Sequence, residues 1–192
     1  MRLAPNGLVR YYPDFLSRAA ADRSRVELTQ KLAWKQLPIT MFGRRILQPR
    51  LTAYYGDPGA DYRYSGLQLL AQPWPAALAE LRDAVAGQIG ERFNSVLCNL
   101  YRHGRDYMGW HADNEPELGL DPLIASVSLG AERRFALKPR DGTADRQVFE
   151  LASGSLLIMS GDLQRHWLHQ LPRSQLVNEE RINLTFRCVV KA

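Results

Sequence analysis

The chain has 192 residues, of which 45% are hydrophobic and 23% are charged, a composition typical of one soluble globular domain with a sizeable core. No window reaches the run of about 18 apolar residues that a transmembrane helix needs, and the N-terminus lacks the apolar core of a secretory signal, so we expect a cytoplasmic protein without membrane contact. The net charge of +5 comes from 21 arginines against 4 lysines, and arginine suits phosphate contacts, so the charge is a weak indication of nucleic acid.

Two segments are predicted to be helices. The first begins at Ser17, a residue type that caps helix N-termini, and runs to about Trp34. The second lies in PWPAALAELRDAVAGQIG, where Leu78, Leu81 and Val85 recur at helical spacing after a proline in the first turn. Both predicted helices lie in the first half of the chain.

The remainder indicates β-structure, because short apolar runs alternate with Gly and Pro. The segments SVLCNLY, LIASVSLG, RRFALK, QVFEL and SLLIMS are predicted strands, and the apolar runs around Cys98 and Cys188 predict buried free thiols. In RINLTFRCV one face is wholly apolar, and the other consists of Arg181, Asn183, Thr185 and Arg187. Such a polar face meets either solvent or a ligand cavity, and the inner face of a closed jelly roll favours the cavity.

The segment MGWHADNE contains a candidate metal motif. His111 and Asp113 are two residues apart, so their side chains share a face only on an extended strand. A third ligand is needed, and His166 or His169, which follow the predicted strand SLLIMS, could supply it. Two histidines and one carboxylate occupy one face of an octahedron and leave three positions open, as in non-haem Fe(II) oxygenases, but a zinc hydrolase could use the same three ligands.

The order of motifs resembles that of the AlkB-type Fe(II)/2-oxoglutarate-dependent dioxygenases, which repair alkylated nucleobases. The resemblance extends from FGRR at 42 to TFRCV at 189 and is strongest to the animal members that act on duplex DNA. It rests on PR, YSGL, CNLYRHGRDYMGWHADNE, IASVSLGAERRF, GSLLIM, HWLHQLP and RINLTFR, in this order. It implies a mainly β (α+β) fold, a double-stranded β-helix of the jelly-roll, cupin-like type with N-terminal helices packed outside.

The same resemblance implies one dioxygenase domain over 1–192. Within it we expect an N-terminal helical extension over 1–36, nucleotide-recognition hairpins and a helix over 37–94, and the double-stranded β-helix over 95–190.

By position, His111, Asp113 and His169 match the iron ligands and hence the catalytic residues, which leaves His166 as a packing or hydrogen-bonding neighbour. The cosubstrate 2-oxoglutarate is matched by Asn99, Tyr101, Arg181, Asn183 and Arg187. The chemistry agrees, because 2-oxoglutarate is a dianion that chelates iron at one end, and its far carboxylate needs a guanidinium that stays charged when buried. The implied cofactors are therefore Fe(II), 2-oxoglutarate and O2.

Substrate residues are also implied by position. Tyr64 matches an aromatic residue that stacks on the flipped base, Glu115 matches an acidic residue that reads its exocyclic amino group, and a half-buried strand residue is the alternative for Tyr64. The finger that fills the gap left by the flipped base is matched by Met41, Phe42, Gly43 and Arg44, with a Phe42 folded onto the core as the alternative. Asn114 departs from the acidic residue expected in duplex-active members, which leaves the substrate preference open.

The function implied is oxidative demethylation of bases such as 1-methyladenine and 3-methylcytosine in DNA or in RNA, with release of succinate, CO2 and formaldehyde. We expect nucleic acid as the partner and a monomeric enzyme. A 2-oxoglutarate oxygenase acting on protein or RNA is one alternative, because the iron site does not specify the target. A non-catalytic binder of damaged nucleic acid is another, but it would not need a complete O2-activating site.

Overall fold

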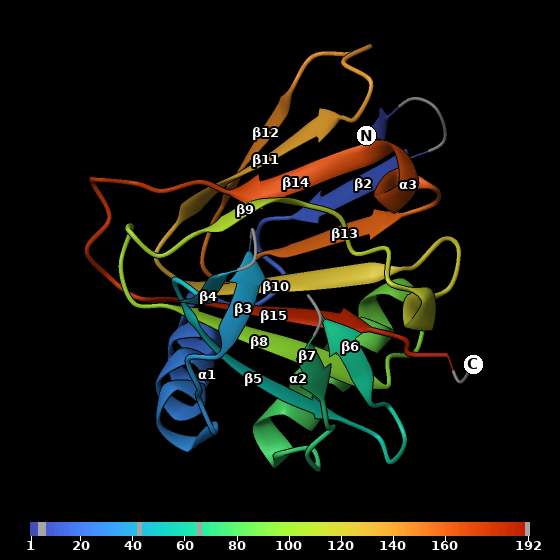
Figure 1. Ribbon diagram of the computed structural model, residues 1–192. Coiled ribbons are helices and arrows are strands. Elements are labelled where there is room, and N and C mark those ends of the chain that lie inside the picture. The colour runs from blue at the N-terminus through green and yellow to red at the C-terminus, as the bar shows by residue number, and fades with distance from the viewer. Residues whose placement is uncertain (4–6, 42–43, 65–66, 191–192) are drawn as a thin grey trace.

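The computed structural model describes residues 1–3, 7–41, 44–64 and 67–190, and two antiparallel sheets dominate it (Figure 1). The large sheet has the order β1 (Arg2–Leu3), β2 (Gly7–Tyr12), β13 (Leu156–Ser160), β10 (Ile124–Gly130), β15 (Arg181–Arg187), β8 (Ser95–Tyr101) and β5 (Leu51–Gly56). The small sheet has the order β12 (Gln147–Leu151), β11 (Arg133–Pro139), β14 (Trp167–Leu171) and β9 (Met108–His111). The predicted mainly β jelly roll is confirmed.

Two helices cover the outer face of the large sheet, α1 (Arg18–Lys31) and α2 (Ala76–Ile89). They form one core cluster with the apolar faces of β8, β10 and β15, which include Val96, Val127 and Leu184. Strand alternation directs the opposite faces of these strands toward the small sheet. Both predicted helices are therefore confirmed. The N-cap of α1 is Ser17 as expected, since its Oγ accepts a hydrogen bond from the backbone N–H of Ala20, and the helix ends at Lys31, before the expected Trp34.

The N-terminal segment is not purely helical, contrary to the expectation for 1–36. β2 pairs with β13 in the large sheet, and Val9 on it is 1% exposed in a second core cluster. Gly7 permits the strand to approach the short helix α3 (Leu163–His166), because a Cβ there would lie 2.6 Å from Leu163 Cδ1. The expectation of two buried thiols is also half wrong, since Cys98 is buried and Cys188 is exposed.

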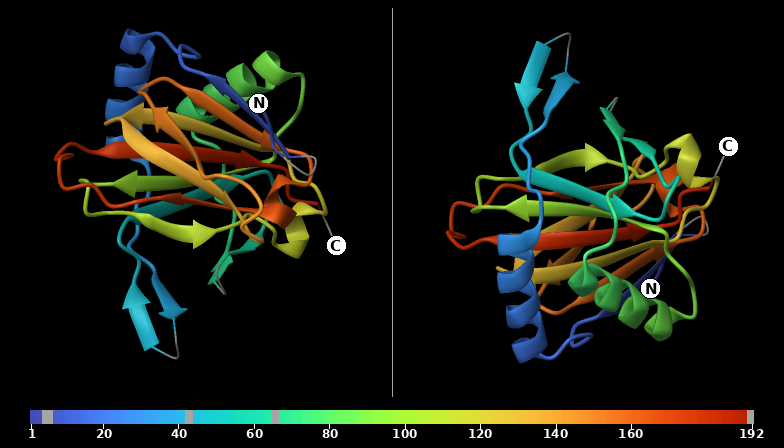
Figure 2. Two further views of the ribbon diagram at one scale, coloured as in Figure 1. Left: turned by 90° about the horizontal axis from the view of Figure 1, so that it is seen from above. Right: turned by 90° about the horizontal axis from the view of Figure 1, so that it is seen from below.

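Two hairpins, β3 (Pro38–Met41) with β4 (Arg44–Leu47) and β6 (Tyr62–Tyr64) with β7 (Leu67–Leu69), stand out from the sheets on the same side in both views of Figure 2. A 3₁₀ turn, η1 (Pro116–Leu118), follows β9. Over the residues that the structure describes, no helix combines the length and apolar character that crossing a membrane requires.

Candidate metal and cosubstrate site

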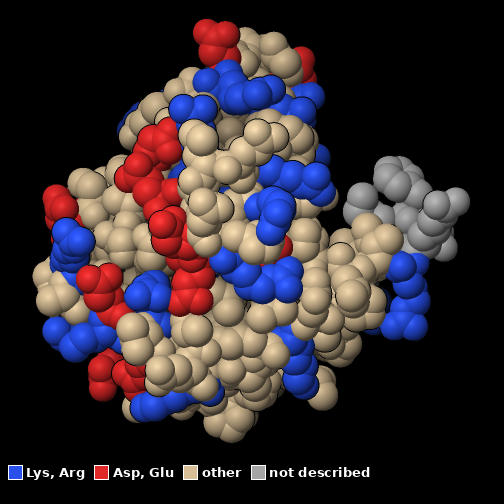
Figure 3. All heavy atoms as spheres, turned by 90° about the vertical axis from the view of Figure 1, so that its left-hand side faces the viewer, with Lys and Arg blue, Asp and Glu red and all other residues tan. Residues whose placement is uncertain are grey.

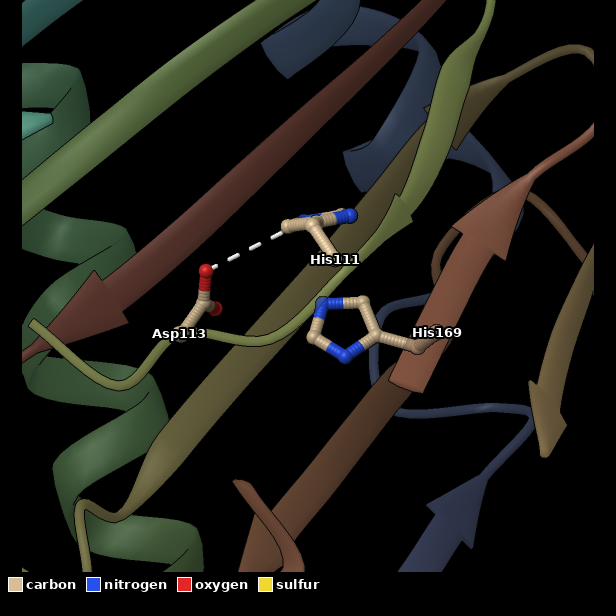
Figure 4. Close-up of side chains that lie close together, drawn as sticks. All are labelled: His111, Asp113 and His169. Carbon is tan, nitrogen blue, oxygen red and sulfur yellow. Dashed lines mark ion pairs between the residues drawn. The ribbon is translucent and has the colours of Figure 1, made fainter. Parts of the chain in front are cut away.

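Three potential metal ligands meet at the edge of the small sheet (Figure 4). His111 ends β9 and is the direct cross-strand partner of His169 on β14, and Asp113 lies two residues beyond the end of β9. One ligand atom from each of the three residues lies within 4.8 Å of the other two. His169 thus lies beside His111 and Asp113, which are two residues apart in the sequence, and supplies the third potential ligand.

Both imidazoles are neutral, and a hydrogen bond orients His111 for ligation. His111 Nδ1 lies 2.8 Å from the carbonyl oxygen of Gly109, and since a carbonyl only accepts, Nδ1 carries the proton and Nε2 keeps its lone pair. This Nε2 lies 3.9 Å from Asp113 Oδ1, and the two imidazole ring centroids are 4.2 Å apart. Burial lowers the pKa of His111 and lowers the pKa of His169 to about 3, so both rings are available as neutral ligands.

The carboxylate of Asp113 has one oxygen engaged and one free among the described residues. Asp113 Oδ2 accepts a hydrogen bond from Arg187 Nη2 at 2.8 Å, whereas the buried Oδ1 has no hydrogen-bond partner. Burial would raise the pKa of Asp113, but the charge and the hydrogen bond of Arg187 outweigh it and hold that pKa below its usual range. An ionised, unpartnered carboxylate oxygen facing two neutral imidazoles fits a divalent cation of the first transition row.

His166 lies outside this cluster. Its side chain is 46% exposed, and its Nε2 is 3.6 Å from Asp162 Oδ2. The geometry therefore favours His169 as the third ligand.

All five predicted cosubstrate residues line the cavity beside the three ligands: Asn99, Tyr101, Arg181, Asn183 and Arg187. They project from β8 and β15, which are neighbours in the large sheet, and the cavity lies between the two sheets. The polar row of β15 therefore faces a ligand cavity and not solvent.

The arginines of this cavity have unpaired donors that suit a dianion. Arg181 is 2% exposed and donates from Nη2 to Ser128 Oγ at 2.9 Å, while its Nε has no partner in the described part of the chain. Arg187 likewise has unpartnered Nε and Nη1 groups. Burial lowers the pKa of Arg181 to about 10, so it stays charged at neutral pH. Buried guanidinium donors of this kind fit the carboxylates of 2-oxoglutarate.

Comparison with known proteins shows to which family the chain belongs. Residues 8–187 match the model of the 2OG-Fe(II) oxygenase superfamily. The chain belongs to this family. Its cofactors are accordingly Fe(II), 2-oxoglutarate and O2, for which the site provides both the metal ligands and the cationic cavity.

Individual relatives of this oxygenase extend over nearly its whole length. It is 39% identical to human alpha-ketoglutarate-dependent dioxygenase alkB homolog 3 over 97% of this chain and 68% of that protein. It is also 39% identical to the mouse DNA oxidative demethylase ALKBH2, over 98% of this chain and 83% of that protein. Because the two identities are equal, they do not show which of these two relatives the chain resembles more. The solved structure of OsALKBH1 has a TM-score of 0.65 at 19% identity, covers 97% of this chain and 100% of that chain, and supports the fold alone.

Several cavity residues of the oxygenase were not predicted. Arg50, from the PR motif, is buried and donates from Nε to Asn99 Oδ1 at 2.6 Å. Tyr62 lies beside the cavity and does not line it: it is 1% exposed, and the guanidinium of the cavity-lining Arg187 lies 5.7 Å from its ring centroid. Met108 and Phe135 also line the cavity. The PR motif, Pro49–Arg50, is the sequence signal that could have pointed to Arg50.

The predicted substrate residues are described only in part. Glu115 is partly buried, and burial together with the nearby Asp113 raises its pKa, against the opposing charge of Arg187. Phe42 and Gly43 lie outside the described residues, while Met41 and Arg44 are backbone partners in the β3–β4 hairpin. Tyr64 ends β6, and its side chain is also outside the description.

Proposed function

We propose that this oxygenase demethylates alkylated bases in DNA. The main structural observation is the His–Asp–His cluster with an unpartnered Asp113 Oδ1 beside buried arginines that have unpaired donors. The target is supported by relatives named DNA oxidative demethylase ALKBH2 in mouse and human, each 39% identical to this chain. We infer methylated adenine and cytosine in DNA as the substrates, with RNA as the second candidate.

In this proposal each residue has a defined task. His111, Asp113 and His169 would hold Fe(II), and Arg181 on β15 would bind the far carboxylate of 2-oxoglutarate. When bound there, Fe(II) and 2-oxoglutarate would supply the O2 chemistry that hydroxylates the methyl group on the ring nitrogen, with release of succinate and CO2. The hydroxymethyl product would then lose formaldehyde and leave the repaired base. The nucleic-acid backbone stays intact in this reaction, so no residue is needed to cleave it.

In this proposal, recognition of the methylated nucleic acid involves Glu115 and the basic residues near the β3–β4 hairpin. Glu115 lies close to the iron ligand Asp113 and, when ionised, favours a positively charged methylated base. On the face in Figure 3, Lys and Arg side chains lie between an acidic band and the projecting β3–β4 hairpin, where exposed Arg45 is available for phosphate. Because every metal and cosubstrate residue comes from one chain, we infer that a monomer is sufficient.

The decisive assay is demethylation of methylated oligonucleotides followed by mass spectrometry. The chain is incubated with Fe(II), 2-oxoglutarate and ascorbate, and with DNA or RNA that carries 1-methyladenine. We expect a loss of one methyl group that requires both cofactors and is abolished in His169→Ala, because the metal loses one of three protein ligands. The matched control His166→Ala should retain most of the activity. Turnover of 2-oxoglutarate that responds to peptides but to no nucleic acid would contradict the proposal.

A further inference from the structure

The main chain at Asp113 depends on a side-chain contact. β9 ends at His111, so Asp113 lies in an irregular segment without the backbone ladder that fixes His111 and His169. Its backbone N–H donates instead to Gln164 Oε1, at 3.0 Å. Because Arg187 holds the carboxylate and Gln164 holds the backbone, the residue is fixed at both ends.

Gln164 is itself firmly placed. It is 1% exposed and lies in α3, which leads directly into β14, the strand that carries His169. Its Nε2 lies 3.9 Å from Met159 Sδ on β13. The amide therefore connects the segment of one metal ligand to the element that positions another.

A purely structural role explains this residue poorly. Its neighbours in α3 and β14, Leu163 and Trp167, belong to an apolar core cluster, where a buried amide carries a desolvation cost. The hydrogen bond that Gln164 Oε1 accepts from the Asp113 N–H offsets that cost, and loss of the acceptor would leave a buried N–H unpaired. An open-sided metal site needs its carboxylate aimed at two imidazoles, so displacement of the Asp113 backbone acts directly on the metal.

We propose that Gln164 is a positioning residue of the metal site. By holding the Asp113 backbone, it places the Asp113 carboxylate so that it faces the two histidine rings. This inference deepens the proposed function, because it rests on the same site binding a divalent metal. It does not depend on which base or polymer is the substrate.

The test uses two substitutions at Gln164 and one control. Gln164→Met keeps the length and loses the acceptor, whereas Gln164→Glu keeps an acceptor oxygen. Gln170→Met makes the same exchange on β14, at a partly exposed position outside the cavity lining. Each chain is stripped of metal and titrated with Mn(II) by electron paramagnetic resonance, its Co(II) visible spectrum is recorded, and its metal-free melting temperature is measured.

We expect Gln164→Met to weaken Mn(II) binding by about 10–100-fold and to change the Co(II) spectrum, in the range typical for residues that orient metal ligands. Gln164→Glu and Gln170→Met should stay within about threefold of the unaltered chain. A lower melting temperature with Mn(II) affinity unchanged in Gln164→Met would show a structural role only and overturn the proposal. Equal weakening in Gln164→Met and Gln164→Glu would also overturn it, because the acceptor would then not matter.

Hydrogen exchange provides a test if Gln164→Met does not fold. In the unaltered metal-free chain, the Asp113 amide should exchange at least about tenfold more slowly than an unprotected amide. Fast exchange of that amide would overturn the proposal. The metal readouts also separate this inference from the proposed function, because a chain inactive on DNA can still show the Gln164 dependence of Mn(II) binding.

Discussion

Arg181 and Arg187 share one face of β15, yet their partners give them different tasks. The family resemblance assigns both to 2-oxoglutarate, and a spacing of six residues on a strand places them on the same side. In the structure Arg187 Nη2 lies 2.8 Å from Asp113 Oδ2, whereas the Arg181 side chain donates a hydrogen bond to the neutral Ser128. We therefore propose that Arg187 supports the metal ligand Asp113 as well as the cosubstrate, and that Arg181 binds a cosubstrate carboxylate.

This difference predicts that matched substitutions of the two arginines affect different properties, 2-oxoglutarate binding in one case and metal binding and stability in the other. Arg181→Met should weaken 2-oxoglutarate binding by about 100-fold, within the 2–5 kcal/mol expected for an unpaired buried charge, and should leave Mn(II) binding and metal-free stability unchanged or higher. Arg187→Met should weaken Mn(II) binding and destabilise the metal-free chain by about 3 kcal/mol, because it leaves the Asp113 carboxylate buried and unpaired. Titration calorimetry and urea unfolding check both, and identical profiles would contradict the distinction.

The lowered pKa values of the two histidines predict an unusual pH dependence. An ordinary imidazole is protonated below about pH 6.5 and then cannot bind metal. Because burial lowers the pKa of His111 and lowers that of His169 to about 3, Mn(II) affinity should change by less than about threefold between pH 8 and pH 6. Mn(II) titrations at fixed ionic strength check this, and a tenfold fall over that interval would contradict it.

The lowered pKa values of the two histidines also determine how the stability of the metal-free chain changes with pH. The folded pKa lies below the unfolded value, so the unfolded chain binds protons first as the pH falls. The metal-free chain should therefore lose stability below about pH 6.5, by up to about 1.4 kcal/mol per pH unit for each buried ring. His169→Asn should reduce this slope in urea unfolding, and an unaltered slope would exclude His169 as its source.

At the scale of elements, the strands with strict alternation were predictable and the irregular ones were not. β8 and β15 were found because apolar and polar side chains alternate along them, with Val96 and Leu184 on the core face and Asn99 and Arg181 on the cavity face. β2 was missed because buried and exposed residues do not form a clean row in GLVRYY, and its pairing with β13 is long-range. Gln164 was missed because a single glutamine in a four-residue helix gives no periodic signal.

The contribution of β2 to the core can be measured directly. Val9→Ala should lower the free energy of unfolding by about 2 kcal/mol, because it removes two buried methyl groups from the cluster between β2 and β13. The adjacent Arg10→Ala, at an exposed position, should change it by less than about 0.5 kcal/mol. Urea unfolding gives both values, and equal effects would contradict the placement of Val9 in the core.

At the scale of the whole molecule, the metal and cosubstrate residues lie between the two sheets, whereas both hairpins stand out on one side (Figure 2). On β4, Arg45, Ile46 and Leu47 are exposed, an arrangement that suits a surface approached by a nucleic-acid backbone and bases. The separation of site and hairpin allows substrate selection to change without a change in the chemistry.

Phe42, which follows β3 in the sequence and lies outside the described residues, offers the corresponding prediction. Phe42 matches the finger of the duplex-active members, and an apolar wedge can replace lost base stacking worth about 1–3 kcal/mol. Such a wedge is useful only where a stack surrounds the flipped base. Phe42→Ala should therefore lower repair of a methylated base in duplex DNA by about tenfold, or about 1.4 kcal/mol, and change repair of the same single strand much less.

Single-turnover rates on matched duplex and single-stranded oligonucleotides measure both effects. The control is Leu47→Ala, at an exposed position on β4. Equal losses on both substrates, or no loss on either, would place Phe42 outside base recognition and leave the finger without a role in strand preference.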